Sequence, residues 1–291
     1  AYSIYRPFER KDTKVTYRVN LDYDINDNAM MYASVTTGHR GGGYNLVFFS
    51  NTASYDPEEL TAYELGYKTQ WLDNSLQLNG SFYYYDYKNV HTVATEASQI
   101  FGTSTSTLAA PGAEIKGLEA ELTWLATDRL TLGGNFSYTP NEYTEDLVMI
   151  DPAGSDSPES IFDTFGAAKN INGNQLLQVP ESKFNGWVSH ATPLDSGATL
   201  MFMSSYSWID KVYYSPFQNE DEMSEAYGRL DLRGSWTSSD GRMIISGFVN
   251  NVLDDIGLVQ VLRTDEGEFF RTSAGTTLPR LYGIEFTVSM N

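Results

Sequence analysis

A two-residue rhythm of polar and apolar side chains is the feature that most limits what this chain can fold into. The rhythm is clearest near the end of the sequence, from Leu281 to Ser289. The apolar members there are Tyr282, Ile284, Phe286 and Val288, and the polar members are Glu285, Thr287 and Ser289. Successive residues of a strand point to opposite faces, so each set occupies one face. This alternation is typical of a β-strand that separates two different solvents.

Eleven stretches carry the same strand character. They are Lys14–Ile25, Ala29–Gly38, Leu60–Trp71, Ser75–Val90, Lys116–Leu125, Leu130–Tyr138, Ser182–Thr192, Thr199–Trp208, Glu225–Thr237, Met243–Val252 and the closing stretch from Leu281. Short turns such as Asp73-Asn74 alternate with long polar connections. The long connections include His39–Glu58, a Ser/Thr-rich loop near Thr103–Thr107 and the acidic segment Pro140–Pro180.

The alternation of short and long connections distinguishes two fold classes. A soluble β-sandwich would also show one apolar and one polar face on each strand. In a membrane barrel, however, all short turns lie on one side of the bilayer and the long loops lie on the other. Aromatic residues also gather near strand ends, as an interfacial girdle requires: Tyr23, Trp71, Tyr84, Trp124, Tyr138, Trp208 and Trp236. We therefore predict an all-β fold, a transmembrane antiparallel β-barrel.

The strand count implies that the barrel is larger than this chain. An open sheet edge is not stable in hydrocarbon, because its backbone groups have no hydrogen-bond partners. Single-chain bacterial barrels have an even number of strands. Eleven strands therefore predict either one overlooked strand or a part of a larger barrel.

Composition excludes several classes of function. No run of about 18 apolar residues is present, so no spanning helix is expected. A net charge of -19 disfavours nucleic acid as a partner, because phosphates would be repelled. The chain has no Cys, and His39, His91 and His190 show no metal-ligand spacing. Since no catalytic motif is found either, we predict no catalytic residues, no enzyme, no metal site and no cofactor.

Several short motifs appear in the order in which one known family has them. They are Thr37–Asn45 (Thr-Gly-His-Arg-Gly-Gly-Gly-Tyr-Asn), Tyr55–Leu60 with Tyr63–Lys68, Phe82–Lys88, Ala113–Glu119, Val249–Asp254 and Pro279–Ile284. Together they make the chain resemble the C-terminal half of the barrel of a TonB-dependent outer-membrane receptor. The resemblance spans nearly the whole sequence. It implies a 22-stranded barrel with a plugged lumen, of which residues 1–291 supply strands twelve to twenty-two without a second domain.

The ends of the sequence add two expectations. Neither the family's N-terminal plug nor its TonB-contacting segment is visible here, and the chain starts at Ala1 inside a polar stretch. This start favours a fragment. The family often ends on an aromatic residue, whereas this sequence continues through Ser289-Met290-Asn291, which leaves open whether Asn291 is the native terminus.

The resemblance implies import of a scarce nutrient across the bacterial outer membrane, driven by the TonB complex through a plug that this chain lacks. Ferric siderophores are the commonest ligands of the family, and haem, cobalamin and glycans are alternatives. The implied partners are outer-membrane lipid, the TonB complex and a small-molecule nutrient. A passive porin-like channel and a soluble β-sandwich binding module remain as readings from other classes.

Two groups of side chains are candidates for function. His39, Arg40, Tyr44 and Asn45 lie at the rim of the predicted barrel, where they suit an anionic ligand. Between them, Gly41-Gly42-Gly43 permits backbone angles closed to other residues. Arg6, Arg10 and Lys11, with Arg40, are expected to offset the acidic loops.

The second group lies along the strands and faces the lumen by parity. It consists of Glu64, Lys68, Glu119 and Glu121. These charged groups are expected to form a network that bonds the plug or lines a water-filled space.

Overall fold

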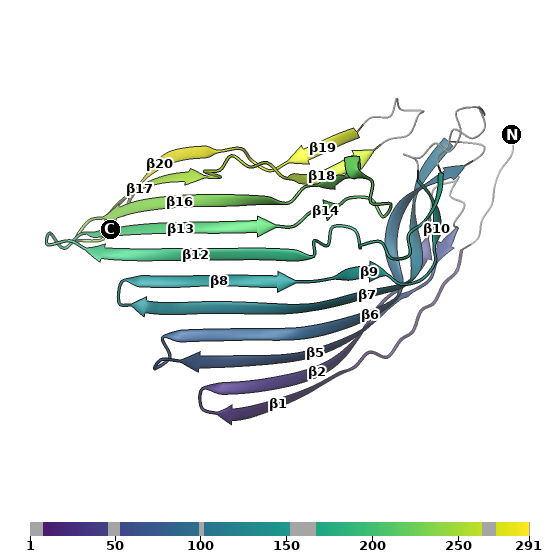
Figure 1. Ribbon diagram of the computed structural model, residues 1–291, viewed down its shortest axis with the longest axis horizontal. Coiled ribbons are helices and arrows are strands. Elements are labelled where there is room, and N and C mark those ends of the chain that lie inside the picture. The colour runs from purple at the N-terminus through teal and green to yellow at the C-terminus, as the bar shows by residue number, and fades with distance from the viewer. Residues whose placement is uncertain (1–7, 46–52, 99–101, 152–166, 264–271, 291) are drawn as a thin grey trace.

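The strands of the computed structural model form one curved antiparallel wall (Figure 1). The structure describes residues 8–45, 53–98, 102–151, 167–263 and 272–290. Eleven strands follow one another across the wall in chain order, which confirms the predicted antiparallel strands. They are β1 (Arg18–Asn26), β2 (Ala29–Arg40), β5 (Glu58–Trp71), β6 (Leu76–Ser98), β7 (Gly102–Thr127), β8 (Leu130–Tyr138), β12 (Ser182–Pro193), β13 (Thr199–Ile209), β16 (Tyr227–Thr237), β17 (Met243–Asn250) and β20 (Leu281–Val288).

The two faces of the wall differ in chemistry. Leu65 lies opposite Phe82 in the ladder, and these apolar side chains are 48% and 57% exposed. The four apolar residues that were predicted on the closing strand are exposed as well. Each square ångström of apolar surface left in water costs about 25 cal/mol, a cost that a hydrocarbon solvent removes. The apolar face is therefore the lipid face, and the opposite face lines the lumen.

Several rings lie over glycines of neighbouring strands and fix the register. Gly117 is opposite Tyr83 in the ladder, and a Cβ on Gly117 would lie 2.4 Å from the Tyr83 ring. Gly133 is likewise opposite Trp187, and a Cβ on Gly133 would lie 2.3 Å from the Trp187 ring. A glycine leaves room for the ring to cover the backbone beside it. A shift of the register by one residue would place these rings against side chains instead.

The short turns all lie at one end of the wall (Figure 1). At the turn between β5 and β6, Leu72, Asp73 and Asn74 have positive φ angles of 52°, 53° and 67°. Gly197 and Gly241 take positive φ in two further turns, at 84° and 71°. Asn, Asp and Gly tolerate this conformation best, so the predicted turn residues do have a conformational role.

The longest strands correct one expectation. The Ser/Thr-rich segment near Thr103–Thr107 was predicted as a loop, but it belongs to β7, which pairs with β6 as far as Ser98 and Gly102. The ladder skips one pair where Asn89, with φ 53°, meets Pro111. Proline has no N–H to donate to a ladder, so the irregularity occurs there. Beyond it the hairpin rises far past its neighbours (Figure 1).

Other boundaries differ by a few residues. The first strand begins at Arg18 rather than Lys14, and β2 continues to Arg40. The strand that was predicted to begin at Glu225 begins at Tyr227. The strand that was predicted to end at Val252 ends at Asn250. Strand ends are the least certain part of any pattern, because flanking polar residues fit both a strand and a turn.

The long connections carry short ladders of their own at the end opposite the turns (Figure 1). These are β3 (Gly43–Tyr44) with β4 (Ser54–Tyr55), β10 (Val148–Asp151) with β11 (Ala167–Asn170), β14 (Val212–Tyr213) with β15 (Met223–Ser224), β18 (Leu258–Arg263) with β19 (Thr272–Thr276), and β9 (Asn141–Tyr143), which pairs with β7. The short 3-10 helix η1 (Glu220–Glu222) also lies there. Within the described segments, no helix is long and apolar enough to cross a membrane. We call this set of connections the outer layer.

Candidate functional site

The predicted rim residues His39 and Arg40 end β2 on opposite faces. His39 lies across from Glu59, and Arg40 lies across from Glu58. Because successive residues alternate, His39 and Glu59 belong to the lipid-side face and Arg40 to the lumen face. The Lys14 ammonium donates to Glu59 Oε1 at 2.6 Å. Arg40 is exposed.

Tyr44 and Asn45 leave the wall and have partners in the outer layer. The Tyr44 ring lies 4.5 Å from the ring of Phe8, centroid to centroid. The Asn45 side chain bridges to β7: its Nδ2 donates to the Thr107 carbonyl at 2.8 Å, and its Oδ1 accepts from the Thr107 N–H at 2.9 Å. The four rim residues are therefore divided between two faces and a separate ladder. Their contact with a ligand stays a prediction.

The glycines between them have a different role from the one expected. None of Gly41, Gly42 and Gly43 has a positive φ, so unusual backbone angles do not explain them. A Cβ on Gly42 would lie 2.4 Å from the Tyr55 carbonyl oxygen, and one on Gly43 would lie 2.3 Å from the Tyr55 hydroxyl. Close approach of β4 is therefore what excludes side chains at these two positions.

The cations expected to offset the acidic loops are only partly available. The Arg10 guanidinium donates to Asp12 at 2.9 Å, to the Tyr55 carbonyl at 2.9 Å and to Asp56 at 3.4 Å. Arg10 thus joins the N-terminal segment to β4, and its charge is already balanced by two carboxylates. Lys11 is exposed. Arg6 lies outside the described residues.

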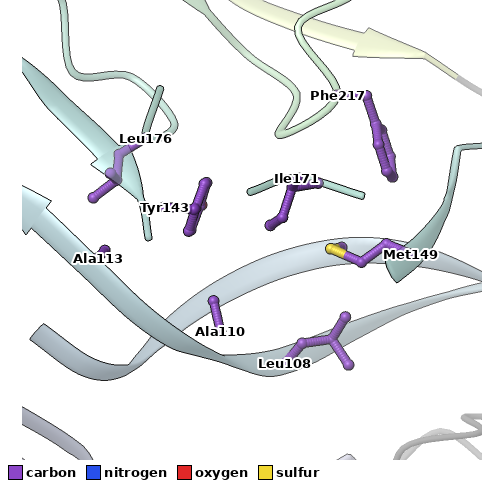
Figure 2. Packing of buried hydrophobic residues seen from close by; sticks show 8 residues of the cluster. All are labelled: Leu108, Ala110, Ala113, Tyr143, Met149, Ile171, Leu176 and Phe217. Atoms are coloured by element: carbon purple, nitrogen blue, oxygen red, sulfur yellow. The ribbon is translucent and has the colours of Figure 1, made fainter. Parts of the chain in front are cut away.

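A small hydrophobic core holds the outer layer together (Figure 2). It consists of Leu108, Ala110, Ala113, Tyr143, Met149, Ile171, Leu176 and Phe217. These residues come from β7, from β9 and β10, from the segment that follows β11, and from the connection after β14. Loops of an ordinary surface are polar and separate, whereas these share a buried core. The outer layer therefore behaves as a folded cap rather than as independent loops.

Buried polar contacts join the parts of this cap. The Tyr143 hydroxyl donates to Thr92 Oγ1 at 3.2 Å, and burial raises the pKa of Tyr143. The Tyr214 hydroxyl donates to the Leu258 carbonyl at 2.7 Å, and the Leu258 N–H donates to Ser224 Oγ at 2.9 Å. These bonds link the raised hairpin to β9 and the β14–β15 connection to β18.

Asp151 is the most buried charge of the described residues, with a side chain that is 0% exposed. The Lys169 ammonium lies 2.6 Å from its Oδ2, and Asn219 Nδ2 donates to the same oxygen at 3.0 Å. Asn219 also donates to Glu222 at 2.6 Å. Sequence reasoning treated Asp151 only as part of an acidic loop. One feature of the sequence could have pointed to a buried carboxylate here: Lys169 is the one basic residue between Pro140 and Pro180, so it needs an acidic partner within this segment.

Asp146 organises the exposed side of the same connection. Its Oδ1 accepts from Asn170 Nδ2 at 2.8 Å and from Asn172 Nδ2 at 2.9 Å. The hydrogen bond from Asn170, followed by that from Asn172, lowers the pKa of Asp146. Both bonds favour the ionised carboxylate.

The lumen face carries the second predicted group, and the structure brings its members together. Glu64, Lys68, Glu119 and Glu121 line one hollow with a volume of about 560 Å³. The Tyr32 hydroxyl donates to Glu64 Oε1 at 2.5 Å. Polar residues of β6 and β8 complete the wall of the hollow, namely Asn79, Ser81, Asn135 and Ser137. The lumen face of β5 to β8 is thus polar and charged.

Metal ligation has no visible basis in the described part of the chain, where no three His, Cys, Asp or Glu side chains are grouped to hold an ion. His91 is instead engaged in the rim. Its backbone N–H donates to Glu58 Oε2 at 3.1 Å, and its ring lies 4.9 Å from the ring of Tyr55.

Comparison with known proteins identifies similar chains. Residues 2–252 match the family described as "TonB dependent receptor-like, beta-barrel". The probable TonB-dependent siderophore receptor PiuA of Acinetobacter baumannii is 24% identical over 208 residues, which cover 68% of this chain and 25% of that protein.

Solved structures share the fold. The ferric yersiniabactin uptake receptor FyuA from Yersinia pestis has a TM-score of 0.72 at 19% identity, over 94% of this chain and 37% of that one. The siderophore receptor PiuA from Acinetobacter baumannii has a TM-score of 0.67 at 19% identity, over 94% of this chain and 35% of that one. The chain thus spans about a quarter of the curated relative's length.

Proposed function

Since the chain belongs to the TonB-dependent receptor family, an outer-membrane family, we propose that it is the C-terminal part of a receptor barrel that imports a ferric siderophore. The names of two similar proteins support this ligand class, because one is a ferric yersiniabactin uptake receptor and the other a siderophore receptor. In this proposal residues 1–291 form one barrel part. They have no catalytic role and hold no cofactor or metal of their own.

The observation that carries the proposal is that the wall has an apolar face suited to lipid and also carries a folded outer layer at one end. A passive channel needs only a polar lumen, whereas a receptor also needs a surface that recognises its ligand. The cap built around Ile171 and Tyr143 supplies an ordered surface at the mouth of the lumen. Ordered side chains bind a ligand at a smaller cost in conformational entropy than mobile loops do.

The two free edges support a larger barrel. Among the described strands, β1 has β2 as its only neighbour in the wall, and β20 has only β17. Edge strands cannot remain unpaired in hydrocarbon. We propose that upstream strands of the same protein pair with β1 and β20 and complete a 22-stranded barrel.

The lumen face supports a plug. Glu64, Glu119 and Glu121 project from the wall beside Lys68. We propose that an N-terminal plug meets this face through complementary polar groups, and that the TonB complex acts on the plug to open a path for the ligand. Ion pairs between plug and wall would form and break at a small net free-energy change, because both states are hydrated.

Growth and uptake in a deletion strain test the proposal. Cells lacking the gene should lose uptake of at least one ⁵⁵Fe-siderophore, and a plasmid copy should restore it. Deletion of tonB should abolish the same uptake. Uptake that persists without TonB would instead indicate a passive channel. If uptake of haem, cobalamin or a glycan, and of no siderophore, depends on the gene, the ligand class changes accordingly.

A further inference from the structure

We propose that the outward face of β12, β13, β16 and β17 binds one glycerophospholipid. A segment of an acyl chain lies against Gly234 and Gly247, and the pair His190 and Thr192 donates a hydrogen bond to an ester or phosphate oxygen of the same lipid. This surface belongs to the apolar face of the wall, so it is separate from the lumen. Each of the four strands has a wall strand on both sides, and completion of the barrel therefore leaves the surface unchanged (Figure 1).

Gly234 and Gly247 leave bare backbone on the lipid face, which we call the glycine patch. The two residues are directly opposite each other in the ladder. Neighbouring atoms cover other strand glycines; a Cβ on Gly283, for example, would lie 2.6 Å from the Phe248 ring. A Cβ on Gly234 or Gly247 would meet no atom within 4 Å, and no other wall glycine whose surroundings the structure describes is so open. The glycine patch is therefore covered only by what surrounds the barrel.

Apolar side chains border the glycine patch. Phe202 and Ile284 continue its row on the two neighbouring strands. Trp236 and Ile245 pair with each other in the next row toward the short turns. A hollow of about 410 Å³ extends from Gly234 along this border toward β12. Hydrocarbon should fill such a hollow in a bilayer, because an empty space deprives its lining of dispersion contacts.

A polar pair, His190 and Thr192 of β12, lines the same hollow. His190 is exposed on the lipid face, where it lies opposite Phe202. Thr192 is one row nearer to the short turns, in the row of Leu200 and Trp236. Because Trp236 belongs to the predicted aromatic girdle, His190 lies one row inside the girdle. Ionisable side chains are rare at this depth and mark functional sites where they occur.

The hydrogen bonds of this pair leave one donor over. Thr192 Oγ1 and His190 Nδ1 are bonded to each other at 3.2 Å. A neutral His190 has one N–H and Thr192 has one O–H, so one of the two donors makes this bond and the other remains. The described part of the chain supplies no second side-chain partner for either residue. Since an unpaired donor is costly in hydrocarbon, the pair requires an acceptor from the bilayer.

A glycerophospholipid meets both requirements. Its ester and phosphate oxygens accept hydrogen bonds and donate none, and they lie at the level of the girdle. Its acyl chains continue from there into the hydrocarbon, past the glycine patch. A second copy of the chain fits less well, because a stable protein interface buries roughly 1,000 Å² or more, whereas the bare surface is only two residues wide.

Native mass spectrometry of the purified full-length receptor in detergent tests the proposal, with palmitoyl-oleoyl phosphatidylethanolamine as the added lipid. The wild type should bind the first lipid molecule more tightly than the second, because only the first occupies the site. In the double variant Gly234→Val, Gly247→Val, the first molecule should bind no more tightly than the second. In His190→Leu, Thr192→Val, it should bind about two- to tenfold more weakly than in the wild type, as expected for one lost hydrogen bond.

The design separates lipid binding from folding. Gly234→Val, Gly247→Val should not lower the midpoint of urea unfolding, because no atom lies within 4 Å of either added Cβ and valine suits a strand. Leu122→Val is the matched control. Leu122 pairs with Leu78 on the lipid face of β7, outside the hollow, so this variant should bind the lipid as the wild type does.

Unchanged binding of the first lipid molecule in either double variant would overturn the proposal. A wild-type dimer that Gly234→Val, Gly247→Val converts to a monomer would also overturn it, because a second copy would then cover the glycine patch. Uptake of the ⁵⁵Fe-siderophore is measured separately, so either failure leaves the proposed receptor function intact.

Discussion

Asn45 and Thr107, 62 positions apart in the chain, pair with each other as two residues of a ladder do. The Asn45 side-chain amide donates to the Thr107 carbonyl at 2.8 Å and accepts from the Thr107 N–H at 2.9 Å. The side-chain amide of Asn45 thus takes the place that the backbone of a neighbouring strand would have. The contact ties the β3–β4 connection to the raised part of β7, so the outer layer extends to the first edge of the wall.

Asn45→Ala should loosen this attachment. Both hydrogen bonds disappear, and each contributes about 0.5–1.5 kcal/mol. Hydrogen exchange measured by mass spectrometry should become faster in peptides that contain Tyr44 and Thr107, with little change in the short turns. Asn28→Ala, an exposed turn residue, is the control. Unchanged exchange at Thr107 would show that the bridge contributes nothing to stability.

Asp151→Asn should destabilise the cap without unfolding the barrel. The substitution keeps the shape of the side chain but removes the charge that Lys169 and Asn219 bind. Hydrogen bonds to a charged group contribute about 1.5–3 kcal/mol, and the half-exposed Lys169 can recover part of this from water.

Exchange should therefore rise in β10 and β11, and the melting temperature of the barrel should hardly change. Asp128→Asn, at an exposed turn on the other side of the membrane, gives the matched loss of charge. Equal effects of the two substitutions would contradict a specific role for Asp151.

Acid should release the contact between Asp146 and its two asparagines. The hydrogen bonds from Asn170 and Asn172 lower the pKa of Asp146 from its ordinary value of 3.8. A lowered folded-state pKa adds stability that is present above pH 3.8 and is lost as the pH falls through the folded value.

Hydrogen exchange near Leu147, corrected for the intrinsic effect of pH, should therefore increase below pH 3.8 in the wild type. In Asp146→Asn, the corrected exchange should not change across this range. A wild-type response with its midpoint above the ordinary value would contradict the stated sign.

Gly117→Ala should destabilise the wall itself. The new Cβ would lie 2.4 Å from the Tyr83 ring and 2.7 Å from the Tyr138 carbonyl oxygen, and the backbone oxygen cannot rotate away. Overpacking of this kind costs about 1–3 kcal/mol. Gly247→Ala is the matched control, because no atom lies within 4 Å of its added Cβ. Urea unfolding in detergent should separate the two variants, and equal midpoints would disprove the steric argument.

Strand number and strand faces could be read from the sequence because both are local properties. The pleat turns every second side chain to the same side, so the solvent on each side leaves its pattern in consecutive residues. All eleven strands of the wall were identified in this way, as was the shared lumen face of Glu64 and Glu119. Each strand of the wall pairs with the wall strands that precede and follow it in the sequence, so the strand order needs no further information.

The cap depended on contacts that no local pattern contains. The segment Thr103–Thr107 has polar residues on both faces and therefore resembles a loop, yet pairing with β6 and the bridge from Asn45 make it a strand. Asp151 and Lys169 lie in the connection between β8 and β12, and Asn219 reaches them from the connection between β13 and β16. Burial decides which acidic residue becomes the centre of this group. Alternation thus determined the wall and its place in a membrane, whereas only the tertiary structure decided how the outer layer closes over it, because residues far apart in sequence share one buried core.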